Sequence, residues 1–522
     1  MLKILFLLLM SGGIPVAIAM AGSALLYILW SGNLPPFVVI HRMVGGIDSF
    51  PLLAVPFFIL AGNLMNNAGI TNRIYNYALA LVGWLKGGLG HVNVVGSVVF
   101  AGMSGTAIAD AAGLGTIEIK AMKDHGYDTE FAVGVTAASA TLGPIIPPSL
   151  PFVIYGMMAN VSVGALFLAG ILPGVLMAIL MMFTVAWFAH KNGWGGDIRF
   201  EWPRVLKALG ETAVVILWPL GLWGLVTQMG LPPQPTVVAG LVLLFVLDRM
   251  LRFQAVLPIM TPVLLIGGMS TGIFTPTEGA IAACIWALVL GFAWYRTLTF
   301  RMFLKICLDT VETTSTVLFI VAAASIFGWM LTATGVTVAI SEWVLGFTRD
   351  PWVFLLIANL LMLFVGCFLE PTAAITILVP ILVPICQQLG IDLVHFGLVM
   401  VLNLMIGLLH PPMGMVLFVL ARVAKLSVER TTMAILPWLF PAAESRRHHL
   451  LPQAGALAAQ AVLLTLARMP ARHGSPLQTL RPRRQGHPAD PRRRQLRRRV
   501  PPRRGQPGAR QPQRSRLARH RH

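Results

Sequence analysis

The sequence predicts an all-α polytopic membrane protein, on the evidence of its composition, its recurring apolar runs and a repeated pattern of helix breakers. Of the 522 residues, 56% are hydrophobic and only 11% are charged, whereas a soluble domain has about 25% charged residues. Apolar runs close to the ~20 residues that span a bilayer recur along the chain. They lie at 50–65, 165–189, 211–227, 280–295, 315–331 and 352–369.

The first apolar run starts at the N-terminus, "MLKILFLLLMSGGIPVAIAMAG", and continues to Trp30. This run is longer than the apolar region of an ordinary signal peptide, which has about 7–15 residues. We therefore predict a first membrane helix here, with a signal peptide as the alternative.

Residues 444–522 differ from the rest of the chain in charge and composition. They contain 20 of the 39 basic residues, all arginine, and 2 of the 20 acidic ones. This tail carries a net charge of +18, whereas residues 1–443 carry +1. Its Arg/Pro-rich composition cannot bury a core, so we expect disorder. The abrupt change favours a shifted reading frame over a native tail that binds nucleic acid or anionic lipid, and we predict no nucleic-acid partner.

Motifs typical of enzymes and ATP-driven pumps do not stand out. The four cysteines (Cys284, Cys307, Cys367 and Cys386) have no C-x-x-C spacing, so we interpret them as small apolar residues and predict no transition-metal site. We find no P-loop, zinc signature or nucleophile elbow. We therefore predict no enzymatic activity and no cofactor. Energy for transport must then come from an ion gradient or a partner chain.

Two proline-rich stretches divide the protein into halves with a common plan. The stretches "TLGPIIPPSLPFV" (141–153) and "GLLHPPMGMVLFV" (407–419) each place a double proline after a glycine. An ungapped overlay with an offset of 264 aligns them and further landmarks. The aligned pairs are Phe100/Phe364, Gly102/Gly366, Gly126/Gly390, Asp128/Asp392, Gly143/Gly407, Pro147/Pro411 and Pro148/Pro412. The two aspartates each precede an apolar run and are candidate helix N-caps.

Each half contains an apolar arm that reaches a break, near "GMSGTAIAD" (102–110) or "GCFLEPTAA" (366–374), and then a returning stretch. A helix follows and is interrupted at the double proline. The first arm, 91–101, would span only about 16 Å at ~1.5 Å per residue, which is half a bilayer. We therefore expect a re-entrant helical hairpin in the first half, and a second hairpin with a longer arm.

The expected domain organisation follows from these landmarks. The first membrane repeat covers 1–190 and the second covers 263–443, with a connecting segment at 191–262 and the Arg/Pro-rich tail at 444–522. The two membrane repeats are expected to be structurally inverted. Paired repeats with interrupted helices at matching positions are typical of secondary transporters and locate their binding sites.

The interrupted helices also indicate where a site would lie. Irregular backbone at membrane depth is tolerated where it is buried in protein or lines a wet cavity. Exposed carbonyl groups there can coordinate sodium, and half-helix N-termini attract anions. The alternative is that the prolines only kink a helix. The candidate backbone positions are Gly143, Pro147, Pro148, Gly407, Pro411 and Pro412.

The first break carries the side chains best suited to a hard cation. Ser104, Gly105 and Thr106 combine hydroxyl groups with free carbonyls, which are oxygen ligands. The alternative is close packing of helices through small residues. Asp110 follows, and a carboxylate within a membrane span is usually functional, although it can also cap a short helix. Ser149 makes the first double proline more polar than the second.

The second break offers a different set of groups. Glu370 follows Gly366 and precedes Pro371 and Thr372. Its carboxylate could ligate a cation, hold a proton or pair with a basic group, and the alternative is a satisfied structural carboxylate. His410 precedes the second double proline and can titrate near neutral pH, but a hydrogen-bonded structural role is the alternative.

These motifs together resemble the large membrane subunit of TRAP (tripartite ATP-independent periplasmic) transporters, dicarboxylate type. The best-matched landmarks are "FFILAGNLMNNAGIT", "GMSGTAIADAAGLGTIEIKAM", "GPIIPPS", "GIFTPTEGA", "EPTAAITILVPILVPI" and "NLMIGLLHPPMGMVLF", and the resemblance covers residues 1 to about 441. It implies a multi-pass protein of the bacterial inner membrane. It also implies sodium-coupled import of a small organic anion, such as a C4-dicarboxylate or a related acid, by an elevator motion.

The resemblance also implies partners and ligand positions. The partners are a small four-helix membrane subunit, a periplasmic substrate-binding protein, the organic anion and membrane lipid. The first sodium site would involve Ser104, Thr106 and the backbone at 143–148, and the second would involve 366–372 and 407–412. Residues 211–262 are longer than the usual connection in the family, and the additional length would accommodate an extra helix pair. The alternative is a single-chain sodium/divalent-anion symporter of the same superfamily.

Overall fold

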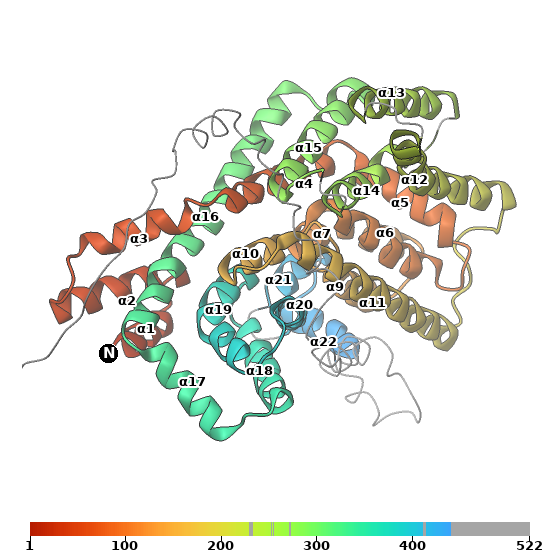
Figure 1. The fold of residues 1–522 in the computed structure, drawn as a ribbon. Coiled ribbons are helices and arrows are strands. Elements are labelled where there is room, and N and C mark those ends of the chain that lie inside the picture. The colour runs from red at the N-terminus through yellow and green to blue at the C-terminus, as the bar shows by residue number, and fades with distance from the viewer. Residues whose placement is uncertain (229–232, 252, 254, 271–272, 411–413, 440–522) are drawn as a thin grey trace, which may run out of the picture. The chain divides into compact units, whose positions relative to one another are not determined.

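The computed structural model describes residues 1–228, 233–251, 253, 255–270, 273–410 and 414–439, and in these residues it is built from helices joined by short loops (Figure 1). The predicted tail at 444–522 and the double proline Pro411–Pro412 lie outside the described residues.

The helices of the first half and of the connecting segment are α1 (Leu2–Ser11), α2 (Val16–Ser31), α3 (Phe37–Ile47), η1 (Phe50–Leu53), α4 (Ala54–Asn67), α5 (Ile70–Val82), α6 (Gly88–Ser104), α7 (Ala107–Ala112), α8 (Leu114–Asp124), α9 (Thr129–Ala140), α10 (Leu150–Met158), α11 (Val163–Asn192), α12 (Trp202–Gln228) and α13 (Pro233–Leu251). Those of the second half are α14 (Val256–Ser270), α15 (Pro276–Leu288), η2 (Val289–Trp294), α16 (Phe300–Ala333), α17 (Val336–Phe347), α18 (Pro351–Gly366), α19 (Pro371–Gln388), α20 (Leu393–Gly407), α21 (Met415–Ala424) and α22 (Val428–Leu439).

The predicted single N-terminal membrane helix is wrong in detail, because the apolar run forms two helices, α1 and α2. Gly13 has a positive φ of 77°, and Pro15 occupies the position before α2. Proline is unfavourable inside a helix and favourable at its start, so the chain breaks there. The helices α2 and α3 pack along α16, as Figure 1 shows for the red and green ribbons.

Six helices in the described residues are long and apolar enough to cross a membrane, at 50–67, 163–192, 202–226, 276–294, 300–333 and 371–388. Five of them overlap apolar runs that the sequence predicts. The predicted run 352–369 instead forms the shorter α18, and the sixth long helix is α19. The polytopic all-helical class is therefore confirmed. The connecting segment contains α12 and α13 ahead of α14.

The offset of 264 that aligns the sequence landmarks also aligns helix ends. The helix α9 starts at Thr129, and α20 starts 264 residues later at Leu393. The helix α8 ends at Asp124, and α19 ends 264 residues later at Gln388. Both halves therefore place their breaks at matching positions of the chain.

The lengths of the two hairpin arms differ from the expectation. The first arm, α6, has 17 residues, which is about 25 Å of helix and not the predicted 16 Å. The second arm, α18, has 16 residues. The helix α6 therefore begins three residues before the expected arm, and its glycines at 88, 90 and 96 are all helical.

Candidate functional site

The first break is built from a left-handed glycine and a helix cap. The helix α6 ends at Ser104, Gly105 follows with φ 65°, and Thr106 is the N-cap of α7. The Thr106 hydroxyl accepts a hydrogen bond from the backbone N–H of Ala109 at 3.2 Å. Glycine adopts this backbone conformation without strain. Gly105 and Thr106 together therefore set the sharp change of direction between the two arms.

The first interrupted helix stops at Ala140 and resumes at Leu150. The fully buried Ser149 is the N-cap of α10, because its Oγ accepts from the backbone N–H of Phe152 at 3.3 Å. The same hydroxyl donates to the carbonyl oxygen of Pro144. The hydroxyl group of Ser149, the polar residue that the sequence analysis noted, therefore closes the break and caps the start of the next helix.

The first break and the first interruption touch each other. The backbone N–H of Leu150 donates to the carbonyl of Gly105 at 3.3 Å. A Cβ atom on Gly105 would lie 2.7 Å from the carbonyl oxygen of Pro148, and one on Gly143 would lie 3.1 Å from that of Thr106. The structure thus brings together the hairpin tip and the interrupted helix, as the sequence predicts.

Ser104 is the unsatisfied group of this junction. Its side chain is 5% exposed, and its Oγ has no hydrogen-bond partner in the described part of the chain. A buried hydroxyl without a partner is costly, and native proteins rarely tolerate one without a functional reason. Ser104 therefore offers a free oxygen ligand beside the last carbonyl groups of α6, which a helix end leaves unpaired.

The second break also begins a helix with a cap, but the cap is a carboxylate. Glu370 is the N-cap of α19 and accepts from the backbone N–H groups of Thr372 at 3.0 Å and Ala373 at 3.3 Å. The Thr372 hydroxyl donates to the same oxygen. Pro371 occupies the first helical position, which suits its missing N–H. Glu370 therefore caps a helix, which agrees with the structural role that the sequence analysis gives as the alternative for this carboxylate.

The second interruption lies after α20. Gly366 at the end of α18 and Gly407 at the end of α20 touch through their backbones: a Cβ on Gly407 would lie 2.7 Å from the Cα of Gly366. The Nδ1 atom of His410 lies 2.9 Å from the carbonyl oxygen of Ile406. The structure brings this break and this interruption together too, and α21 resumes after Gly414.

Helices of each half also pack against helices of the other half. The resumed helix of the first half, α10, packs against α19 of the second, and the resumed helix of the second half, α21, packs against α7 and α8 of the first. The helices α10 and α19 also pack against α20 (Figure 1). The Tyr155 hydroxyl on α10 donates to the carbonyl of Leu393 at 2.6 Å, which joins the halves near α20. The resumed helix of each half therefore packs against helices of the other half.

The sequence reasoning missed several buried polar groups of the first hairpin. Asn93 donates to Thr136 at 2.7 Å and accepts from Ser139 at 2.6 Å, which ties α6 to α9. Glu118 on α8 is 1% exposed and was not singled out. A carboxylate in the otherwise apolar "GLGTIEI" was the available signal for Glu118.

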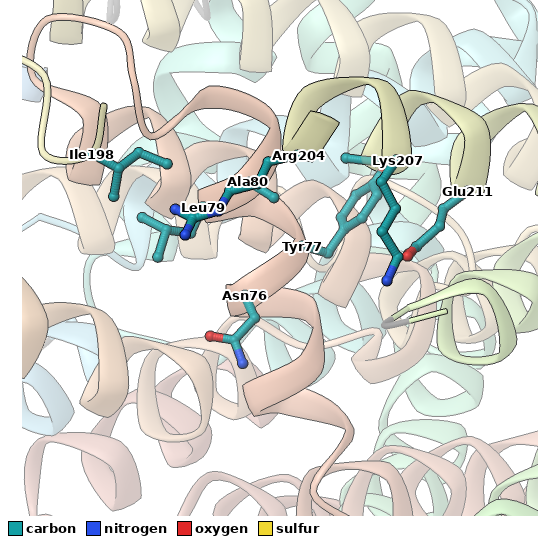
Figure 2. Close-up of a pocket in the computed structure, with 9 residues that line it drawn as sticks. Asn76, Tyr77, Leu79, Ala80, Ile198, Arg204, Lys207 and Glu211 are labelled. Atoms are coloured by element: carbon teal, nitrogen blue, oxygen red, sulfur yellow. The ribbon is translucent and has the colours of Figure 1, made fainter. Parts of the chain in front are cut away.

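A separate pocket of about 280 Å³ lies between α5 and α12, away from both tips (Figure 2). It is lined by Asn76, Tyr77, Leu79, Ala80, Ile198, Arg204, Lys207, Ala208 and Glu211. The Tyr77 hydroxyl lies 2.6 Å from the hydroxyl of Thr212 on α12. None of the predicted site residues lines this pocket.

Comparisons with known proteins identify the family of the chain. A family model described as "Tripartite ATP-independent periplasmic transporter, DctM component" matches residues 3–445. The sialic acid TRAP transporter large permease protein of Vibrio cholerae is 41% identical over 433 residues, which cover 83% of this chain and 91% of that protein. The C4-dicarboxylate TRAP transporter large permease protein of Rhodobacter capsulatus is 31% identical, with 83% and 92% covered.

A solved structure supports the fold alone. The crystal structure of the YdaH transporter of Alcanivorax borkumensis is similar with a TM-score of 0.52 at 12% identity, covering 82% of this chain and 85% of that one. The family model and the relatives establish the family as well as the fold, because the matches cover most of this chain and most of each relative. The chain therefore belongs to the DctM family of TRAP transporter large permease subunits, and it is a multi-pass inner-membrane component of a secondary transporter and not an enzyme.

Proposed function

We propose that this chain is the membrane pathway of a sodium-coupled importer for a small organic anion. The observation that carries the proposal is the junction of two broken elements in the first half, with the unpartnered hydroxyl of Ser104 buried beside it. Hydroxyl and carbonyl oxygens are suitable ligands for a hard cation such as sodium.

In this proposal the first sodium ion binds Ser104, Thr106 and the backbone of 143–148. The close approach between Gly105 and Pro148 supports it, because one ion could then contact carbonyl oxygens from both segments. The second ion binds the backbone at 366–372 and 407–412. The contact between Gly366 and Gly407 supports that site in the same way.

The substrate is a carboxylate anion held between the two tips. Relatives are named for sialic acid, C4-dicarboxylates and 2,3-diketo-L-gulonate, all of which are organic acids. A bound sodium ion would reduce the cost of placing an anion in a region of low dielectric constant. The N-terminus of α10 would add a favourable backbone dipole, which attracts negative charge, whereas the N-terminus of α19 is already capped by the carboxylate of Glu370. A C4-dicarboxylate or a related carboxylic acid remains our proposed class.

The proposal includes two protein partners and a movement. A periplasmic substrate-binding protein delivers the anion, and a small membrane subunit, expected to have four helices, supports the large one in the lipid bilayer. The inverted repeats then move as an elevator, carrying both hairpins. The alternative is a single-chain sodium/divalent-anion symporter, which would need neither partner.

Reconstituted vesicles test the proposal. The large and small subunits are inserted together, and uptake of a panel of radiolabelled organic acids is measured with and without the binding protein and an inward sodium gradient. We expect uptake only when both are present. Uptake without the binding protein would favour the single-chain symporter, and uptake without sodium would contradict sodium coupling.

A further inference from the structure

The pocket between α5 and α12 has no part in the proposed transport pathway, yet charged side chains line it. Arg204, Lys207 and Glu211 come from α12, and Asn76 comes from α5 (Figure 2). The lining therefore contains two cations and one carboxylate, a net charge of +1. Charged groups are costly on a membrane-spanning helix and usually have a function there, so their presence around one cavity requires an explanation.

The negative charge of this pocket is held inside the protein. Glu211 is 2% exposed, and its carboxylate accepts a hydrogen bond from the backbone N–H of Ala255 at 3.1 Å. Figure 2 shows the side chains of Lys207 and Glu211 pointing toward one another. Both cations, in contrast, belong to exposed residues. The pocket thus has a buried negative group and a positive rim.

The two cations can both reach one anion. Arg204 and Lys207 are three residues apart on α12, so they are neighbours on the helix surface. Arg204 pairs with Glu201 through its Nε atom at 2.9 Å, and both side chains are about half exposed. Such exposed pairs contribute little to stability. The guanidinium group has five N–H donors, so its terminal amino groups can still bind a phosphate in a bidentate manner.

Aromatic side chains mark the depth of the pocket in the membrane. The rings of Trp84 and Phe200 lie 4.8 Å apart, and those of Phe200 and Trp202 lie 4.9 Å apart. All three residues are exposed, and Trp202 is the first residue of α12. Tryptophan is enriched at the level of the lipid headgroups. The start of α12, where Arg204 and Lys207 lie, is therefore expected at that level.

The rest of α12 presents an apolar surface beside the pocket. Only 12% of the most apolar stretch of this span is buried, whereas the value for the other five spans is 44–67%. The exposed large apolar residues are Leu206, Leu209, Ile216, Leu217 and Leu220. A cationic pocket at headgroup level, next to an exposed apolar helix, matches the two chemical parts of a phospholipid.

We propose that this pocket binds the headgroup of an anionic phospholipid. Arg204 and Lys207 hold the phosphate group, and the amide of Asn76 donates a hydrogen bond to the headgroup. The acyl chains lie along the exposed apolar surface of α12. The single negative charge of a phosphodiester balances the net charge of +1 on the lining residues.

The second half provides a comparison for this site. Gly69 and Gly335 have the same φ of 71° and directly precede α5 and α17, so these two helices correspond at a spacing of 266 residues. At that spacing Tyr77 corresponds to Trp343. Tyr77 is 5% exposed and packs beneath α12, whereas Trp343 is 74% exposed. The cover that α12 gives to α5 and the basic residues it contributes are therefore additions to the first half.

Native mass spectrometry of the purified full-length protein, titrated with phosphatidylglycerol in detergent, tests the proposal. We expect one tightly bound lipid per chain. Because each basic residue attracts an anionic lipid, binding should be at least about ten-fold weaker in the double variant Arg204→Gln/Lys207→Gln. The matched control is Arg301→Gln/Lys305→Gln, which removes two exposed basic residues from the start of α16 and should bind like the wild type. No tight lipid in the wild type, or equal binding in the two double variants, would overturn the proposal.

A second variant covers the case in which the loss of charge prevents folding. Ala80→Phe fills the pocket and keeps both cations, so it should also weaken binding, and unchanged binding would contradict the assigned position.

Two competing ligands identify what is recognised. A diacylglycerol with the same acyl chains should bind far more weakly, and equal binding would show that the apolar surface alone holds the lipid. Excess inorganic phosphate should not release the lipid, and release would show that the site recognises free phosphate. The measurement uses neither sodium nor substrate, so its result is independent of the proposed transport function.

Discussion

The two hairpin arms have nearly the same length and quite different chemistry. The first arm, α6, carries His91, Asn93, Ser97 and Ser104, all of which are buried. At the offset of 264 the second arm carries Leu355, Ile357 and Leu361, and Phe368 follows it. Ser104 is 5% exposed and Phe368 is 46% exposed. The first half thus has a polar, buried arm, and the second half has a more apolar arm that is buried along one side and exposed along the other.

This difference teaches that the two halves share the positions of their breaks but not the surroundings of those breaks. In both halves a glycine at the break touches the interruption, and a cap starts the next helix. Polar side chains occur where α6 is enclosed by α5, α8, α9 and α11. Such groups are too costly on an arm that is exposed to lipid.

The largest effect is expected from Gly105→Ala at the first tip. The new Cβ would meet the Pro148 carbonyl at 2.7 Å, and the φ of 65° is strained for alanine. Left-handed strain costs roughly 1–2 kcal/mol, and overpacking adds about 1–3 kcal/mol. We expect severe loss of folded protein, measured as detergent-stable monodisperse material.

Gly126→Ala is the matched control for that substitution. Gly126 has a φ of 82°, but a Cβ atom added there would meet no atom within 4 Å. Only the strain of roughly 1–2 kcal/mol should remain. Equal losses in the two variants would show that the close contact at the tip contributes nothing.

An intermediate effect is expected from Asn93→Ala. The substitution removes two hydrogen bonds between α6 and α9, to Thr136 and Ser139. Interhelical hydrogen bonds in membranes average about 0.6 kcal/mol each, so a loss of about 1 kcal/mol is expected. The midpoint of thermal unfolding in detergent measures the effect.

Asn403→Ala in the second half sharpens the same comparison. The side chain of Asn403 donates one hydrogen bond to the side chain of Asn359 on α18. Its other hydrogen bond goes to the carbonyl of Val399 on its own helix. The expected loss is about half as large, at ~0.6 kcal/mol for one interhelical bond. A larger loss than in Asn93→Ala would reverse our view that the first arm depends more on polar contacts.

The smallest effect is expected from Arg430→Ala, which breaks the ion pair between the halves. Arg430 Nη2 lies 2.6 Å from Glu130 Oε1, and the two side chains are 67% and 44% exposed. Exposed pairs contribute about 0–1 kcal/mol and are screened by salt. We expect a small shift of the unfolding midpoint that disappears at high salt, and a large, salt-independent shift would contradict this.

Sequence reasoning found the breaks because their causes are local. Glycine and proline are unfavourable inside a helix, so Gly105, Gly366 and the first double proline marked their sites in advance. It underestimated the length of α6, because the expected arm covered only 91–101 and the helix runs from Gly88 to Ser104. It also overlooked Glu118, because the space over Gly96 that its carboxyl group occupies arises only when α6 and α8 pack together.

Substituting Ser104 and measuring the sodium dependence of uptake is the most direct test of whether the first tip binds an ion. The sodium concentration for half-maximal uptake should be measured in vesicles that contain both membrane subunits and the binding protein. Ser104→Ala should raise it several-fold at unchanged abundance in the membrane. The control Ser341→Ala, a buried serine whose hydroxyl bonds within its own helix, should leave it unchanged. A sodium dependence that is the same in Ser104→Ala and the wild type would contradict the assignment.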